Sequence, residues 1–270
     1  MKLFCSFGFT ALGRSLSSLL AAAVVLGLAG SPTANGAGLV EPFTYSNGNL
    51  TAVSGGAWQF WEPGAGDASA VNGAMRFDGS TDVIRTFPAV LTVPGQTATI
   101  SFTINVNVAD NLEGYAMDFL PSSAPFSAST NYGNQFSLGF DYEAFANQGD
   151  GRASIDVAEG GSANAFERLG SMSQAATHSI RVELARGAAN TSYSLFVDEI
   201  FLHSGSFLLT DPRGMNAVEL EQSGASMPDA NGFAIVDNLT VTVTPEPTSC
   251  ILLALGCTAL LTVRLRRKSF

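Results

Sequence analysis

The stretch TATISFTINVNV, residues 97–108, alternates polar and apolar side chains through its whole length. Successive side chains of a β-strand point to opposite faces, so this pattern predicts one long strand with a buried face and a solvated face. The same alternation recurs at 136–142, 180–184 and 193–197, and in shorter form at 115–119 and 218–220. None of these runs keeps a helical period, and the chain is therefore predicted to be all-β.

Turn-forming clusters rich in glycine, asparagine and aspartate separate these runs, among them 64–67, 94–95, 147–151 and 229–232. Strands that are apolar on one face can bury those faces by stacking two antiparallel sheets. We therefore expect one domain over residues 38–244, an antiparallel two-sheet β-sandwich of roughly a dozen strands. A parallel β-helix is the competing architecture, but no fixed short repeat supports it.

The charge balance of this domain is strongly acidic. Residues 38–244 contain 7 arginines, no lysine and 22 acidic residues, which leaves a net charge of −15 (7 minus 22). Such a surface repels polyphosphate, so nucleic acid is not an expected partner. The three cysteines, Cys5, Cys250 and Cys257, lie outside the domain, which therefore forms no internal disulfide.

The N-terminal segment, residues 1–37, has the layout of a secretory signal peptide. Lys2 and Arg14 precede an apolar run at 16–30, and small residues follow up to Ala37. This order of charge, apolar core and small side chains predicts a cleavable signal helix, cut by signal peptidase near residues 34–37. A retained membrane helix is the alternative.

The C-terminal segment, residues 245–270, has three parts: Pro245-Glu246-Pro247, an apolar run at 249–263 and a basic tail at 264–268. The prolines prevent a helix from starting earlier. Fifteen helical residues at about 1.5 Å each reach about 22 Å, which makes a short transmembrane helix. Its cationic end, with Arg264, Arg266 and Arg267, stays on the cytoplasmic side and leaves the domain outside.

These three parts resemble the PEP-CTERM sorting signal over about the last 27 residues, with Pro245-Glu246-Pro247 as the defining triplet. The resemblance implies that a transpeptidase of the exosortase type recognises the triplet and removes the transmembrane helix and the basic tail. It also implies a bacterial producer of exopolysaccharide. The protein would then reach the cell envelope, the outer surface or the extracellular matrix, with a transient inner-membrane anchor. An ordinary single-pass anchor is the alternative.

The domain itself resembles the concanavalin-like jelly roll, the laminin G-like and lectin-like family. The resemblance rests on 72–79, on the pair 177–184 and 191–198, and on a closing strand at 233–241. It implies two antiparallel sheets with 177–184 and 191–198 as neighbours. Hydrolases of this fold carry Glu-x-Asp-x-x-Glu on one strand, whereas this chain has Ser154-x-Asp156-x-x-Glu159.

Ser154 therefore stands where those hydrolases carry the attacking carboxylate, and the segment is interpreted as a polar outer face followed by a turn. Nucleophilic catalysis by serine needs a base, and the chain has only His178 and His203. His178, in phase with Ile180, is interpreted as a histidine at the core edge rather than a base. From these residues we expect no catalytic site and no enzyme activity.

Calcium is the one cofactor that the residues leave open. Asp110 and Glu113 supply loop carboxylates, although no EF-hand spacing is present. Asp237 shares the phase of apolar residues in 233–243, so a bulge turns it outward, or backbone donors or an ion hold it inward.

Candidate glycan contacts are Trp58, Trp61 and Tyr132, because aromatic rings stack on sugars when they are exposed. The alternative is that both tryptophans fill the core. Export signals joined to a catalytically sparse domain favour a non-enzymatic envelope or matrix protein with a structural or glycan-contacting role, with exopolysaccharide as a candidate partner. Two alternatives remain: an enzyme acting on extracellular polysaccharide, and an adhesion scaffold without sugar affinity.

Overall fold

The computed structural model describes residues 36–61, 66–77, 81–107, 114–121, 136–141, 151–159, 166–223 and 232–244. All of them belong to the compact unit Asn35–Phe270. The predicted sorting signal and almost all of the predicted signal peptide fall outside these ranges, as do the side chains of Asp110, Glu113 and Tyr132. Within the described ranges, no helix has the length and apolar character needed to cross a membrane.

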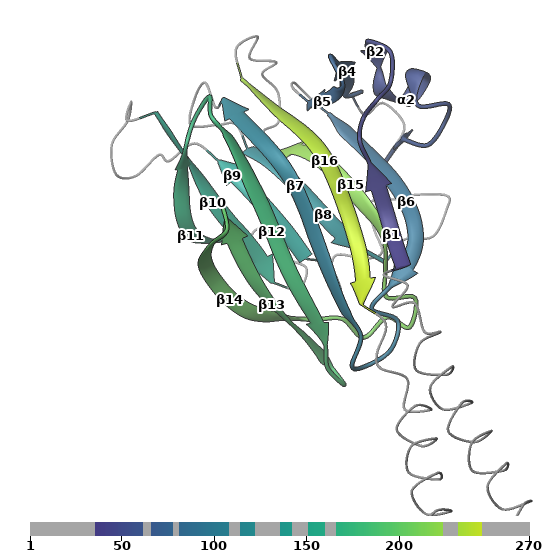
Figure 1. Ribbon diagram of the computed structural model, residues 1–270, viewed down its shortest axis with the longest axis vertical. Helices are drawn as coiled ribbons and strands as arrows, with labels where there is room; N and C mark the ends of the chain where they lie inside the picture. The colour runs from purple at the N-terminus through teal and green to yellow at the C-terminus, as the bar shows by residue number, and fades with distance from the viewer. Residues whose placement is uncertain are drawn as a thin grey trace, which may run out of the picture. The chain divides into compact units, whose positions relative to one another are not determined.

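The described residues form sixteen strands and one short helix (Figure 1). In chain order the elements are β1 (Gly36–Glu41), β2 (Gly48–Asn49), α2 (Leu50–Val53), β3 (Gln59–Phe60), β4 (Ser69–Val71), β5 (Ala74–Phe77), β6 (Asp82–Val90), β7 (Thr97–Asn107), β8 (Gly114–Leu120), β9 (Phe136–Asp141), β10 (Arg152–Glu159), β11 (Phe166–Ser173), β12 (Thr177–Arg186), β13 (Asn190–Val197), β14 (Ile200–Leu208), β15 (Met215–Ser223) and β16 (Phe233–Thr244).

The strands form two sheets, and all pairings between named strands are antiparallel. The first has nine strands in the order β14-β13-β12-β7-β16-β5-β4-β2, with β1 also paired to β16. The second has seven strands in the order β11-β10-β9-β8-β15-β6-β3. The predicted antiparallel two-sheet sandwich is confirmed, and short strands such as β2 to β5 raise the strand count above a dozen.

β7 confirms the prediction made from its alternation, because every second side chain along it is buried. Its neighbours β12 and β16 pair with it over nearly its full length. β12 and β13 are adjacent, as the jelly-roll resemblance implied. The turn between β4 and β5 is Asn72-Gly73, and both residues have positive φ, 52° and 83°, as a two-residue hairpin turn of type I′ requires.

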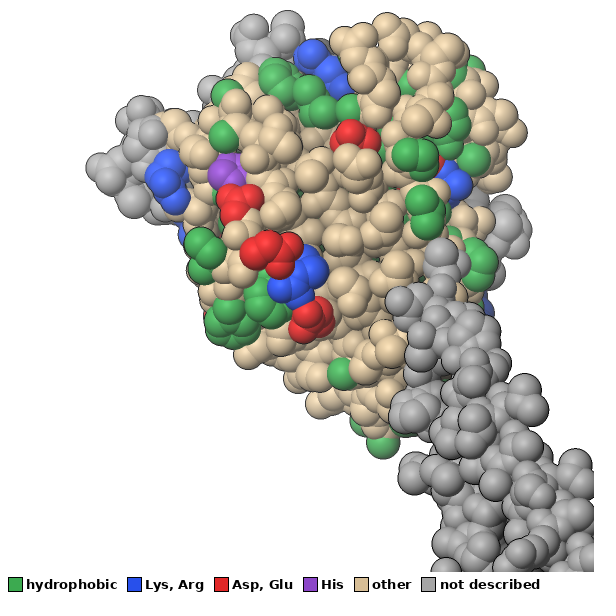
Figure 2. Space-filling model, in the orientation of Figure 1, with side chains coloured by type: hydrophobic (Ala, Val, Ile, Leu, Met, Phe, Trp, Pro, Cys, Tyr) green, Lys and Arg blue, Asp and Glu red, His purple; other side chains and the backbone are tan. Residues whose placement is uncertain are grey.

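The outer face of the first sheet carries mostly uncharged polar side chains, with charged groups gathered over β12 and β14 (Figure 2). Those charges include Arg181, which forms ion pairs with Glu183 and Glu199 and lies over the ring of Phe196 at 3.8 Å. The hydroxyl-bearing residues of β7 and β16 form the rest of this face, and Ser101 and Thr240 hydrogen-bond across the strands at 2.7 Å.

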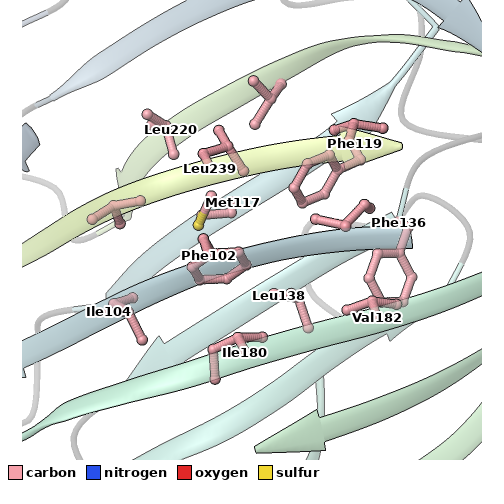
Figure 3. Close-up of a cluster of buried hydrophobic side chains, with 14 of the residues drawn as sticks. Phe102, Ile104, Met117, Phe119, Phe136, Leu138, Ile180, Val182, Leu220 and Leu239 are labelled. Atoms are coloured by element: carbon pink, nitrogen blue, oxygen red, sulfur yellow. The ribbon is translucent and has the colours of Figure 1, made fainter. Parts of the chain in front are cut away.

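The two inner faces meet in one hydrophobic core (Figure 3). From the first sheet, Phe102, Ile104, Ile180, Val182 and Leu239 point inward, and from the second, Met117, Phe119, Phe136, Leu138 and Leu220 meet them. The ring of Phe102 lies edge-on to Phe140 of the opposite sheet, with ring centroids 6.4 Å apart. Such pairs lock the two sheets face to face by burying aromatic surface.

The segment after β1 is held by the carboxylate of Glu41, whose side chain is buried. Its Oε1 accepts the backbone N–H of Phe43 at 2.8 Å, and its Oε2 accepts the Tyr45 hydroxyl at 2.8 Å and the Trp58 indole N–H at 3.1 Å. Arg85 forms an ion pair with the same carboxylate. Trp58 is thereby fixed inside the core, stacked on Phe43.

Candidate functional site

The outer face of the second sheet carries the candidate site. Along β8, Tyr115, Met117 and Phe119 point into the core, so the alternate residues, Asp118 among them, point to the outer face. All seven residues of β8 are buried, which means that its outer face is shielded from solvent as well as its inner one. A carboxylate placed there sits in a low-dielectric environment.

Asp118 lies directly opposite Glu219 of the neighbouring strand β15. The two residues are only 4% and 3% exposed. Glu221 and Asp82 lie opposite each other on β15 and β6, one residue pair further along the same face. Four carboxyl groups on three adjacent strands therefore form one group, which we call the carboxylate cluster: Asp82, Asp118, Glu219 and Glu221.

The pKa of Asp118 is raised to about 7, mainly by burial and in smaller part by the charges of Glu221 and Asp82, while a hydrogen bond from Ser137 opposes the shift. Burial also raises the pKa of Glu219 far above its usual range, with added contributions from the charge of Asp118 and from Asp82, which is hydrogen-bonded to it. At neutral pH, Glu219 is protonated and Asp118 is near the midpoint of its titration. One Asp118 oxygen, Oδ1, has no hydrogen-bond partner among the described residues.

A second polar group lies further along the same face, on β10 and β11. Asp156 is 3% exposed, its Oδ2 accepts a hydrogen bond from Ser154 at 2.7 Å, and its Oδ1 lies 3.4 Å from Arg168 Nε. The strands between Glu221 and Asp156 place Ala116 and Gly139 in register with them. These two positions carry almost no side chain, so no bulky side chain of the sheet stands between Glu221 and Asp156.

The segment Ser154 to Glu159 has its polar residues Ser154 and Asp156 on the outer face, as its sequence predicts, but both are buried there. Glu159 Oε1 accepts the hydroxyl of Tyr193, a residue of the first sheet, at 2.7 Å. Asp156 and Glu159 are an odd number of residues apart, so their side chains leave the strand on opposite faces. This strand therefore supplies one acid to the outer face, not a pair.

The tryptophans do not form an exposed sugar platform. Trp58 is fully buried against Phe43 and Glu41, so its prediction as a glycan contact is wrong. Trp61 is 5% exposed and packs with Ile84, Leu120 and Ala217 in a small second hydrophobic cluster. This cluster borders the carboxylate cluster, because Ile84 lies opposite Glu219. Tyr132 lies outside the described residues.

Of the three candidate calcium ligands, only Asp237 lies among the described residues. Asp110 and Glu113 lie outside the described residues. Asp237 sits at a bulge in β16, and its Oδ1 accepts the backbone N–H of Asn238 at 2.7 Å. Of the arrangements left open for Asp237, the structure has the bulge, and the side chain is not held inward, since it shares the phase of Ile235 and not that of the buried Val236. Within the described ranges, no set of three or more His, Cys, Asp or Glu side chains is grouped as metal ligands.

Asp118 and Glu219 are not among the residues predicted from the sequence, because the prediction of each strand used only its alternating apolar residues. A signal was present in both. Residues 114–120 read GYAMDFL, where one aspartate interrupts an otherwise apolar run, as expected for a strand buried on both faces. Residues 217–221 read AVELE, where two acids alternate with the apolar Val218 and Leu220. What the sequence lacks is the register that brings the two strands together.

No protein-family model matches the chain, and no curated protein is significantly similar to it. Among solved structures, an endo-1,3-beta-glucanase from Streptomyces sioyaensis is similar over 80% of this chain and 99% of its own, with a TM-score of 0.53 and 16% identity. A mutant of the alginate lyase Aly36B, in complex with an alginate trisaccharide, is similar over 77% of this chain and 98% of its own, with a TM-score of 0.50 and 14% identity. These likenesses support the concanavalin-like jelly roll.

These neighbours correct one expectation. The sequence predicts a non-enzymatic protein with a structural or glycan-contacting role, because no catalytic pattern is found along its strands. Both solved structures of the same fold are enzymes whose names refer to polysaccharides, which contradicts that expectation and favours its enzyme alternative. The pattern along any single strand does not reveal the two buried acids Asp118 and Glu219, which come from strands about 100 residues apart.

Proposed function

We propose that this protein is a glycoside hydrolase that acts on extracellular polysaccharide, with Asp118 and Glu219 as its pair of carboxyl groups. The observation that carries the proposal is the direct opposition of these two buried side chains on β8 and β15. Opposed residues on neighbouring strands place their Cβ atoms about 4.5–5.5 Å apart. Carboxyl groups that hang from such positions can take up the separation of about 5–5.5 Å that retaining hydrolases use.

The pKa shifts assign the roles. Hydrolysis of a glycosidic bond needs one protonated carboxyl group to protonate the leaving oxygen and one carboxylate to attack the sugar or activate water. Glu219, whose pKa is raised far above neutrality, keeps its proton and serves as the acid. Asp118, whose pKa is about 7, is the group that ionises and serves as nucleophile or base. Two carboxyl groups with separated pKa values are the pattern of an acid and base pair.

The same electrostatics select the substrate class. Asp82 and Glu221 add negative charge beside the catalytic pair, and the 7 arginines of the domain are outnumbered by its 22 acidic residues. A polyuronate would bring carboxylates into this field and be repelled. A neutral glycan meets no such penalty, so the proposed substrate is an uncharged polysaccharide, with β-1,3-glucan as the first one to test because of the glucanase neighbour.

The test is release of reducing ends from a neutral β-1,3-glucan, from the producer's own exopolysaccharide and from alginate. The expected result is turnover of at least one neutral glycan and none of alginate. Asp118→Asn and Glu219→Gln should each lower kcat by about 10²–10⁴-fold, the usual contribution of a positioned acid or base. The double variant should lose little more than either single variant, because residues that act as a unit are not additive.

Glu183→Gln is the matched control, since Glu183 lies on the outer face of the other sheet and is exposed. It should keep the activity of the parent protein. Unchanged turnover in Asp118→Asn would contradict the proposal, as would the absence of turnover on every neutral glycan tested. Thermal melts of each variant show whether a loss of activity reflects unfolding.

We also propose that the domain is exported and sorted by an exosortase, on the strength of residues 1–37 and 245–270. The mature protein would then meet its polysaccharide outside the inner membrane. Replacing Pro245-Glu246-Pro247 by alanines should leave a larger, membrane-associated form, detected by fractionation and immunoblotting. Recovery of the full-length chain in the cytosol of the parent strain would contradict export.

A further inference from the structure

Three side chains at one edge of the sandwich are linked by hydrogen bonds, and none of them belongs to the carboxylate cluster. His178 Nδ1 lies 2.7 Å from Asp198 Oδ2, and His178 Nε2 lies 3.0 Å from the hydroxyl oxygen of Ser173. A carboxylate, an imidazole and a serine hydroxyl in this order are the arrangement that activates serine for acyl transfer. The sequence alone places His178 at the edge of the core, without any link to Ser173 or Asp198.

The three residues come from three different segments. Ser173 ends β11, His178 is near the start of β12, and Asp198 lies in the turn between β13 and β14. That turn, Asp198-Glu199, has positive φ at both residues, 49° and 62°. Asp198 Oδ1 accepts the backbone N–H of Ser179 at 2.9 Å, and the Asp198 N–H donates to the Ser179 carbonyl at 2.8 Å. The carboxylate is therefore fixed in position on both of its oxygens.

We propose that Ser173, His178 and Asp198 form an acyl-transfer centre that hydrolyses esters of short carboxylic acids. Ser173 is the nucleophile, His178 is the general base, and Asp198 is the positioning residue that holds the imidazole with Nδ1 protonated. In that tautomer the Nε2 lone pair faces the hydroxyl of Ser173 and accepts its proton. The proposal does not rest on the carboxylate cluster, which lies on other strands.

A hollow of about 310 Å³ lies beside the three residues and sets the size of the substrate. Its apolar wall comes from Val197, Phe201 and Leu202, with Phe201 57% exposed, and Ser173, His178 and Arg152 lie on its polar side. This volume is at the lower end of the range for small-molecule sites. It suits an acyl group of a few carbons, such as an acetyl ester on a sugar, and not a long fatty chain.

The reaction balances with water as the only co-reactant. Ser173 Oγ forms a bond to the ester carbonyl carbon as its proton moves to His178 Nε2. His178 returns that proton to the leaving alcohol oxygen as the carbon–oxygen bond breaks. Water then attacks the acyl-serine, gives a proton to His178, and releases the carboxylic acid as Ser173 regains its proton.

The groups around His178 and the hollow are a carboxylate, a backbone carbonyl and an arginine. The hydrogen bond with His178, followed by that from the Ser179 backbone, holds the pKa of Asp198 below its usual range, so its carboxylate stays ionised. The backbone carbonyl of Ser173 lies 3.1 Å from His178 Nε2 and can accept a hydrogen bond from it once the ring is charged. Arg152, fixed by hydrogen bonds to Ser171 at 2.7 and 2.8 Å, brings positive charge to the hollow where the oxyanion forms.

The test is covalent labelling with a fluorophosphonate, read by peptide mass spectrometry, together with hydrolysis of p-nitrophenyl acetate, butyrate and decanoate. The expected result is a label on Ser173 and a preference for acetate or butyrate over decanoate. Ser173→Ala should abolish the label and lower kcat/KM by about 10²–10⁴-fold. Asp198→Asn should lower both label and rate, because the imidazole then loses the partner that sets its tautomer.

Ser206→Ala is the matched control, because Ser206 is an exposed serine on β14 outside the hollow, and it should keep the label and the rate. Ser173→Ala removes one exposed hydroxyl and should melt as the parent protein does, so its readout reports chemistry. If the parent protein takes no label on Ser173, or if Ser173→Ala hydrolyses the acetate ester as fast as the parent, the three residues are a structural clamp and the proposal is wrong.

Discussion

Asp118 and Glu219 face each other across the β8–β15 pair with both carboxyl groups buried and with Asp82 and Glu221 beside them. The folded protein therefore keeps protons that the unfolded chain releases near pH 4. Natural selection on stability alone would replace such a pair by apolar or amide side chains, which avoid the cost of burying charge. The pair lowers stability at neutral pH, as the acids of an active site often do.

The first prediction concerns the stability of the Asp118→Asn variant. The pKa of Asp118 is raised from 3.8 to about 7, so between those values the folded state binds more protons than the unfolded state. The free energy of unfolding then falls as pH rises through this window, by about 4 kcal/mol over about three pH units. A neutral amide at this position removes the loss, so the variant should melt higher than the parent at pH 8, and the difference should shrink towards pH 4.

The control for this prediction is Asp211, whose pKa is shifted in the opposite direction. A hydrogen bond from Arg213 holds the pKa of Asp211 below its usual range, so Asp211 contributes stability above its unfolded pKa and loses it as pH falls. Asp211→Asn should therefore melt lower than the parent at pH 7, and the difference should vanish below about pH 3. If the melting temperatures of both variants, relative to the parent, changed in the same direction with pH, the raised pKa of Asp118 would be refuted.

The second prediction concerns the buried carboxylate of Glu41. Glu41→Ala removes the carboxylate that pairs with Arg85 and leaves the Trp58 indole N–H and the Phe43 N–H without their acceptor. Removing one partner of a buried ion pair costs about 3–5 kcal/mol. Urea unfolding should show a lower midpoint with an unchanged slope. Trp58→Phe removes a single donor and should cost less; an equal or greater loss would show that ring packing outweighs the carboxylate.

The third prediction separates calcium from the backbone donor at Asp237. Its Oδ1 already accepts the Asn238 N–H in the bulge of β16. Asp237→Ala should therefore cost only about 0.5–1.5 kcal/mol, the usual net value of one hydrogen bond. The cost should be the same with and without EDTA, measured by thermal melts. If EDTA removes the difference between parent and variant, Asp237 binds an ion.

The fold was predictable where a strand has one wet face. β7 and β12 alternate cleanly because their outer faces meet solvent, and the structure has both strands where the alternation predicts them. β8 is buried on both faces, so its sequence is almost continuously apolar and its alternation is weak. The one charged residue that breaks that run, Asp118, is also one of the two acids that we propose to be catalytic.

The sites were less predictable because each depends on contacts between distant segments. Asp118 and Glu219 meet only through the register of β8 with β15, which no local pattern encodes. Ser173 and His178 are five residues apart, but Asp198, which contacts His178, lies in the hairpin turn between β13 and β14. That turn is Asp-Glu rather than the Asn-Gly that marks type I′ turns in sequences, so it gave no signal.

The fourth prediction uses neighbours of Asp118 that shift its pKa in opposite directions. As the proposed nucleophile or base, Asp118 works only when ionised, so kcat/KM should rise with pH through a limb near pH 7. The charge of Glu221 raises that pKa, so Glu221→Gln should move the limb to lower pH. The hydrogen bond from Ser137 lowers it, so Ser137→Ala should move the limb to higher pH. Glu183→Gln, on the other sheet, should leave the limb in place. Two neighbour variants that shift the limb in the same direction would show that a group other than Asp118 controls the rate.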